Sequence, residues 1–258
     1  MISCGIDGGA RNTKVVILKD GKIIGKGMAL TGFEQKVAAE AAINVAISEA
    51  GIKREDIEYI VATGEGQKEI EFANDTITVV GADTIAVNTL FPQVRTVIDI
   101  GAEEGRAIKC DEKGKVIDFA INEKCAAGAG TFCETMARTL EVKIEEMGAI
   151  SLKSTKSIPM NAQCAVFAES EVVSLIHAKT PKEDIANAVH SAISDRIASM
   201  ARRVGIEKEV ALVGGVAKNI GFVEALKKDL EVEFLIPDDP LFITAYGAAI
   251  SAIDKVSS

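Results

Sequence analysis

The sequence predicts an α/β protein built from two similar halves with a nucleotide cleft between them. The main observation is an internal repeat: Thr96-Val-Ile-Asp-Ile-Gly101 mirrors Ser3-Cys-Gly-Ile-Asp-Gly-Gly9 and aligns Asp99 with Asp7. Both copies continue through a polar loop into an apolar strand, and then into a turn with Gly-Lys before two apolar residues. Repeated strand and turn patterns indicate two related units. A chain of 258 residues can also bury a large core.

Residues 1–92 are expected to form the first half, with a C-terminal helix of about 242–258 packed back on it. Apolar β-branched runs predict strands, and Ala-rich periodic runs predict helices. The expected strands are 2–7, 13–18, 22–28 and 58–63, and the expected helices are 37–50 and 79–90.

Residues 93–241 are expected to form the second half, which carries the two candidate metal-binding cysteines described below. A capping box from Thr180 to Glu183 predicts a long helix that ends near Gly205. The expected elements that follow are a strand at 210–213, a helix at 219–230 and a strand at 232–236.

Composition excludes several classes of protein. The net charge is −9 without a basic block, so we expect no nucleic-acid partner. No apolar run approaches the length of a membrane span, and the chain begins without a charged leader, so we expect a cytoplasmic protein without membrane contact. Five scattered cysteines do not suggest a disulfide framework.

Two turns, Asp7-Gly8-Gly9 and Asp99-Ile100-Gly101, each place a carboxylate at a strand end. Together with the loop residues that directly follow them, they are called the first and the second phosphate turn. Two such turns can hold a triphosphate with backbone N–H groups, while Asp7 and Asp99 hold Mg²⁺ through water. A third turn at 214–217, between a strand and a helix, suits an adenosine. The expected nucleotide-binding residues are Gly8, Gly9, Asn12, Thr13, Lys14, Gly101, Ala102, Gly128, Gly130, Gly214, Gly215, Val216, Lys218 and Asn219.

Cys125 and Cys164 each precede a run of helix-forming residues. A helix N-terminus favours negative charge and lowers a thiol pKa, which suits a thiolate ligand to a metal such as iron in an iron–sulfur cluster. Cys4 and Cys110 are expected to be structural, and Cys133 is expected to be a packing residue although it could approach a cluster. The two histidines, His177 and His190, are expected to be ordinary helix residues. The pair Glu169 and Glu171 is expected to lie on a helix surface or at an interface rather than to be catalytic.

The order of the three turns resembles the superfamily that contains acetate kinase, sugar kinases, actin and heat-shock chaperones, whose two ribonuclease-H-like halves duplicate a βββαβα order. Within it, residues 124–130 and 164–172 resemble a narrower group, and residues 213–219 resemble the adenosine motif of that group. This narrower group comprises the activators of 2-hydroxyacyl-CoA dehydratases and the ATP-binding subunits of benzoyl-CoA reductase. The resemblance covers essentially the whole chain.

This resemblance implies a dimer of identical or related chains, with one [4Fe-4S] cluster at its interface held by Cys125 and Cys164 of each subunit. Two thiolates cannot complete a four-cysteine cluster, so a symmetric partner is needed. The resemblance also implies that hydrolysis of ATP to ADP drives a low-potential electron into a CoA-ester-reducing partner protein. A ferredoxin- or flavodoxin-type donor would supply that electron.

The second phosphate turn departs from the Asp-Ile-Gly-Gly-Gln-Asp pattern of the activators. Glu103 replaces a glutamine expected near the γ-phosphate, and Glu104 replaces an aspartate. Residues 63–67 and 105–108 are closer to a benzoyl-CoA reductase subunit. We expect Asp7 and Asp99 to be catalytic, and Glu103 is a candidate general base or water-positioning group.

Two other classes of function remain open. A small-molecule kinase of the same superfamily would lack a cluster and would hydrolyse ATP only with its substrate. A nucleotide-binding interaction module would bind ATP without turnover, and the glutamate at position 103 is its one sequence indication.

Overall fold

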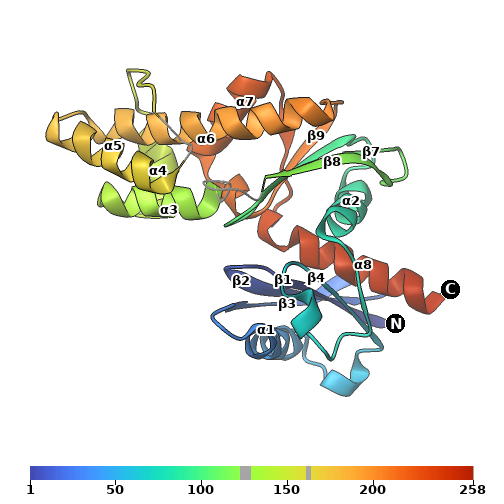
Figure 1. Ribbon diagram of the computed structural model, residues 1–258. Helices are drawn as coiled ribbons and strands as arrows, with labels where there is room; N and C mark the ends of the chain where they lie inside the picture. The colour runs from blue at the N-terminus through green and yellow to red at the C-terminus, as the bar shows by residue number, and fades with distance from the viewer. Residues whose placement is uncertain (123–128, 161–163, 258) are drawn as a thin grey trace. The chain divides into compact units, whose positions relative to one another are not determined.

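The computed structural model describes residues 1–122, 129–160 and 164–257, and they form two compact units (Figure 1). Unit 1 consists of Met1–Val94, Cys110–Ile117 and Leu241–Ser258. Unit 2 consists of Arg95–Lys109 and Asp118–Pro240.

Unit 1 is organised around a five-stranded sheet in the order β3-β2-β1-β4-β5. β1 pairs antiparallel with β2 and parallel with β4, so the chain turns back tightly once and then crosses over through a helix. The strands are β1 (Ile2–Gly8), β2 (Asn12–Lys19), β3 (Lys22–Leu30), β4 (Tyr59–Thr63) and β5 (Asp75–Thr76).

Helices cover both faces of this sheet. Alternate residues of the buried strands point to opposite faces, so Val15 and Ile17 pack on α1 (Gln35–Ala50) while Val16 and Leu18 pack on α8 (Ile243–Ser257). The unit also contains α2 (Val79–Leu90) and the short 3₁₀ helices Arg54–Asp56 and Gln67–Glu69, and a further 3₁₀ helix, Pro240–Phe242, leads into α8.

Unit 2 repeats this topology. Its five-stranded sheet has the order β10-β9-β6-β7-β8, which is the order of unit 1 when each strand is replaced by its counterpart. β6 pairs antiparallel with β7 and parallel with β9, as β1 does with β2 and β4. The strands are β6 (Thr96–Ile100), β7 (Gly105–Cys110), β8 (Val116–Asn122), β9 (Val210–Val213) and β10 (Phe234–Leu235). The expected duplication is confirmed.

The helices of unit 2 enclose a core that includes Phe132, Met136, Met147, Ile193 and Phe222. They are α3 (Ala129–Thr139), α4 (Ile144–Ser151), α5 (Ala165–His177), α6 (Lys182–Val204), the 3₁₀ helix η3 (Gly215–Lys218) and α7 (Ile220–Leu230). None of the helices in the described ranges is long and apolar enough to span a membrane.

Two local predictions were wrong. The long helix exists, but its N-cap is Pro181 and no side chain caps it, because Pro181 is extended and leaves Thr180 outside the helix start. The strand expected at 232–236 shortens to Phe234–Leu235, the two residues that pair with Val210 and Ala211 of β9. The bounds of α2 and β9 agree with those expected from the sequence.

Candidate functional site

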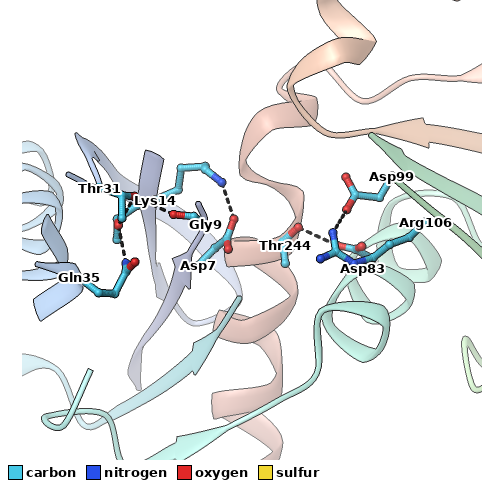
Figure 2. Close-up of polar contacts among 10 residues, drawn as sticks. Asp7, Gly9, Lys14, Thr31, Gln35, Asp83, Asp99, Arg106 and Thr244 are labelled. Carbon is cyan, nitrogen blue, oxygen red and sulfur yellow. Dashed lines mark hydrogen bonds and ion pairs between the residues drawn. The ribbon is translucent and has the colours of Figure 1, made fainter. Parts of the chain in front are cut away.

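The first phosphate turn of unit 1 carries a buried ion pair. Asp7 lies at the end of β1 directly opposite Lys14 of β2, and the Lys14 Nζ is 2.5 Å from the Asp7 Oδ2 (Figure 2). Both side chains are largely buried, at 9% and 12% exposure. Burying a carboxylate is costly unless it is paired, so the ion pair with Lys14 offsets part of the cost of burying Asp7.

Glycines allow the turn that follows β4 to approach Asp7. Gly64 follows β4 with a φ of +86°, and a Cβ added there would lie 2.6 Å from the Asp7 Oδ1. The Gly66 N–H donates to the Gly8 carbonyl over 2.9 Å. No other residue fits at position 64, because a side chain would meet both the carboxylate and the Gly8 carbonyl, 2.7 Å away.

The second phosphate turn, in unit 2, has the same arrangement. Asp99 of β6 lies opposite Arg106 of β7, whose Nη1 donates to the Asp99 Oδ2 over 2.9 Å (Figure 2). The Arg106 Nη2 donates to Glu104, so one guanidinium serves two carboxylates. In both units the cation follows its aspartate by seven residues. Glu103, the candidate base, is exposed at this turn.

Gly214 has the same relation to Asp99 that Gly64 has to Asp7. It follows β9 with a φ of +86°, and an added Cβ would lie 2.5 Å from the Asp99 Oδ1 and 2.4 Å from the Ile100 carbonyl. This glycine brings the expected adenosine turn against the second phosphate turn within one unit. Next to it, Gly215 and Val216 lie in η3, and exposed Lys218 pairs with Asp239 at 3.3 Å.

Asn219 caps α7 and joins a buried polar chain. Its Oδ1 accepts from the Phe222 N–H over 3.2 Å, and its Nδ2 lies 3.0 Å from the His190 Nε2. The other ring nitrogen lies 3.0 Å from the Ser151 Oγ, which itself donates to the Gly148 carbonyl. His190 is therefore a neutral Nδ1–H tautomer, and burial lowers its pKa to about 4.

The start of α3 is hydrogen-bonded to the second phosphate turn. The Gly130 N–H donates to the Gly101 carbonyl over 3.2 Å, and the Thr131 N–H donates to the Ala102 carbonyl over 3.0 Å. A Cβ added at Gly130 would lie 2.9 Å from the Ala102 Cα, so the approach requires glycine. These bonds satisfy helix N–H groups that no carbonyl of the helix itself can reach.

The cysteines fall into two environments. Cys4, Cys110 and Cys133 are buried, and burial raises the pKa of Cys4 and of Cys133 to about 12, so they act as packing residues. Cys164 is half-buried at the N-cap of α5, and its neighbours Val166 and Phe167 are 67% and 68% exposed. Cys125 and Gly128 lie outside the described residues.

Some residues of the site were not predicted to be part of it. In the sequence, Arg106 belongs to the stretch that resembles reductase subunits, and the repeat aligns it with Lys14, which is the signal that identifies it. Thr31 and Gln35 carry no sequence signal, because their partners are distant in the chain. Gly64 enters the sequence analysis only through the reductase resemblance of residues 63–67, and His190 only as an ordinary helix residue. Among the expected residues, Thr13 is fully buried and contacts Gln35 rather than solvent.

The duplicated fold and the two paired Asp–cation turns define a class of nucleotide-binding α/β proteins. The chain belongs to the BadF/BadG/BcrA/BcrD ATPase family, whose model matches residues 4–252.

The relatives include activators of dehydratases and a reductase subunit. The activator of lactoyl-CoA dehydratase of Anaerotignum propionicum is 38% identical over 254 residues, which cover 98% of each chain. A benzoyl-CoA reductase subunit of Thauera aromatica is 32% identical over 82% of this chain and 77% of its own. The structure of the activator of the 2-hydroxyisocaproyl-CoA dehydratase from Clostridium difficile with bound ADPNP has a TM-score of 0.94 and 35% identity. It covers 100% of this chain and 96% of its own.

Proposed function

We propose that this protein is an ATP-hydrolysing electron-transfer component, which delivers a low-potential electron to a CoA-ester dehydratase or reductase in the cytoplasm. Membership of the ATPase family and the names of the activator and reductase relatives support this proposal. The activator is the more similar of these two relatives, at 38% identity over 98% of each chain against 32% over 82% of this chain for the reductase subunit.

The two phosphate turns would bind ATP with Mg²⁺. Each offers glycine backbone beside a buried carboxylate, and carboxylate oxygens with water are the ligands that Mg²⁺ prefers. Lys14 and Arg106 neutralise Asp7 and Asp99, and either cation can also attract a phosphate oxygen. The exposed carboxylate of Glu103 would orient or deprotonate the attacking water. Gly214 to Asn219 would contact the adenosine.

The observation that carries the proposal is the bonding of α3 to the second phosphate turn. The Gly130 and Thr131 N–H groups hold the Gly101 and Ala102 carbonyls, and α3 directly follows the segment that contains Cys125. A nucleotide that moves this turn must therefore move the start of α3 or break those bonds. Nucleotide drives such a motion only as far as it binds the moved state more tightly.

Cys164 suits one ligand position of a [4Fe-4S] cluster. This cysteine is half-buried at the N-cap of α5, whereas the other cysteines of the described ranges are buried. The described residues hold no group of three His, Cys, Asp or Glu side chains that could bind a metal. The proposed further ligands are Cys125 and the same two cysteines of another chain. The cluster, when bound, would supply a one-electron carrier of low potential.

A second subunit would also cover the exposed Val166 and Phe167 beside Cys164. We propose a homodimer or a pseudo-symmetric heterodimer with a related chain. A ferredoxin- or flavodoxin-type protein would be the electron donor.

The test is anaerobic purification followed by iron and sulfide analysis of the wild type, Cys164→Ser and Cys133→Ser. A cluster shared by two chains predicts about two irons per chain, absent in Cys164→Ser and retained in Cys133→Ser. Phosphate release with ATP should be measurable without any sugar or acid substrate. A colourless protein that forms ADP only with a small-molecule acceptor would favour the kinase alternative instead. Nucleotide binding without phosphate release would favour the interaction module.

A further inference from the structure

A chain of three hydrogen bonds ends on the first phosphate turn. The Gln35 Nε2 donates to the Thr13 Oγ1 over 2.6 Å, and the Thr13 Oγ1 lies 3.1 Å from the Thr31 Oγ1. The Thr31 Oγ1 donates to the Gly9 carbonyl over 2.7 Å. Figure 2 shows Gln35, Thr31 and Gly9 along this series of hydrogen bonds. Thr13, Thr31 and Gln35 are all at least nine-tenths buried.

The donors in this series of hydrogen bonds all point in one direction. A hydroxyl has one hydrogen, and Thr31 gives its hydrogen to the Gly9 carbonyl. Thr13 must therefore donate to Thr31, and its oxygen accepts from the Gln35 amide. Each group has a defined role, so the whole network holds the Gly9 carbonyl toward the buried side of the turn.

Gln35 is itself held in place by glycines. A Cβ added at Gly8 would lie 2.9 Å from the Gln35 Nε2, and one added at Gly66 would lie 2.3 Å from the Gln35 Cδ. The amide is thus wedged between the phosphate turn and the turn that follows β4. This packing leaves the side chain little freedom to release Thr13.

The direction of the Gly9 carbonyl determines the direction of the next amide. A trans peptide places its C=O and its N–H on opposite sides. With the Gly9 carbonyl bonded to Thr31, the Ala10 N–H points away from the buried network, and Ala10 is exposed. If the peptide turned over, a carbonyl would take the place of this N–H and would repel a phosphate oxygen.

We infer that Thr31 and Gln35 are positioning residues for nucleotide, which act through Gly9 to present the Ala10 N–H to a phosphate of ATP. Neither residue touches the nucleotide itself. This inference rests on the proposed binding of ATP to the first phosphate turn, and it adds two residues that lie outside the Asp-Gly-Gly turn.

The experiment compares Thr31→Val, Thr31→Ser and the control Thr89→Val. Valine keeps the shape of threonine without the hydroxyl, and Thr89 also donates to a carbonyl, but on the exposed side of α2. Thr31→Val should raise the KM for MgATP roughly tenfold with little change in kcat, since one hydrogen bond to a charged group is lost. Thr31→Ser should behave as the wild type because it keeps the donor, and Thr89→Val should also be unchanged.

Gln35→Met is a second variant, which keeps the length of the side chain but removes the amide donor. It should raise the KM in the same direction, and the double variant with Thr31→Val should be no worse than the poorer single variant. Binding of the ATP analogue ADPNP with Mg²⁺, measured by titration calorimetry, separates the two proposals, because this analogue keeps all three phosphates. Equal affinity of the wild type and Thr31→Val would overturn this inference alone. A wild type that binds no nucleotide would overturn the proposed function and this inference with it.

Discussion

Gly214 lies directly against the carboxylate of Asp99, so closely that an added Cβ would be 2.5 Å from the Asp99 Oδ1. Gly64 stands in the same relation to Asp7 in unit 1, at 2.6 Å. Each unit thus joins the end of its first strand to the turn after its parallel neighbour through a glycine with positive φ. The contact explains why a small residue is needed at these two turns, and it can be tested by substitution.

Gly214→Ala should destabilise the protein and weaken nucleotide binding. A left-handed backbone costs an L-residue about 1–2 kcal/mol, and the clash with the Ile100 carbonyl adds roughly 1–3 kcal/mol. The matched control is Gly205→Ala, which has a φ of +83° but no atom within 4 Å of its added Cβ. Urea unfolding should show the backbone cost alone for Gly205→Ala. Equal losses in the two variants would contradict the close contact with Asp99.

Arg106→Met should lower the free energy of unfolding by roughly 3–5 kcal/mol, because it leaves the buried Asp99 without its cation. Arg106→Lys should lower the free energy of unfolding by less. Lysine keeps the positive charge but cannot donate to Asp99 and Glu104 from two separate nitrogens. The control is Lys109→Met on the same strand. Its ion pair with Glu207 has side chains 29% and 53% exposed, so its loss should cost less than about 1 kcal/mol. A similar cost for Arg106→Met would show that Asp99 does not depend on Arg106.

His190 should make the stability depend on pH. Its pKa is about 4 in the folded protein against 6.5 for the free side chain, so the unfolded chain binds more protons between these values. The contribution of His190 to the free energy of unfolding is therefore fully present above pH 6.5 and is lost as the pH drops toward 4. This one group should lower the free energy of unfolding by about 2 kcal/mol between pH 7 and pH 5.

The measurement is urea unfolding at both pH values for the wild type, His190→Gln and His177→Gln. His177 is exposed, so its replacement should leave the pH dependence unchanged, whereas His190→Gln should remove most of it. A wild type with equal stability at pH 7 and pH 5 would refute the assignment of a buried neutral histidine.

Gly247→Ala should separate α2 from α8. An added Cβ would lie 1.8 Å from the Ala82 carbonyl of α2, and backbone atoms cannot move aside as a flexible side chain can. We expect a loss of roughly 1–3 kcal/mol in spite of the better helix propensity of alanine. Gly81→Ala is the control, because its added Cβ comes no closer than 3.1 Å to the Thr78 Oγ1. Thermal unfolding should place this control within about 1 kcal/mol of the wild type. A stabilised Gly247→Ala variant would mean that the two helices are not in close contact.

Much of the fold was predictable, because it depends on patterns that are local or repeated. The repeat around Asp7 and Asp99 indicated a duplication that the two sheet orders confirm. Continuous apolar runs gave the bounds of β9, and helical composition gave those of α2. Local cues failed at Thr180, where an extended Pro181 moved the helix start, and at Val232, where strand length depends on a pairing partner.

By itself, the sequence determined that the chain has two related halves, which glycine turns carry the carboxylates, and that five cysteines are spread among them. These properties depend on residue type and spacing, which the sequence states directly. Only the tertiary structure decided that Arg106 serves two carboxylates, that Thr31 holds the Gly9 carbonyl, and that α3 is bonded to the second phosphate turn. Such contacts depend on distances between segments far apart in the chain, and burial in the folded state is what makes an unpaired polar group there costly.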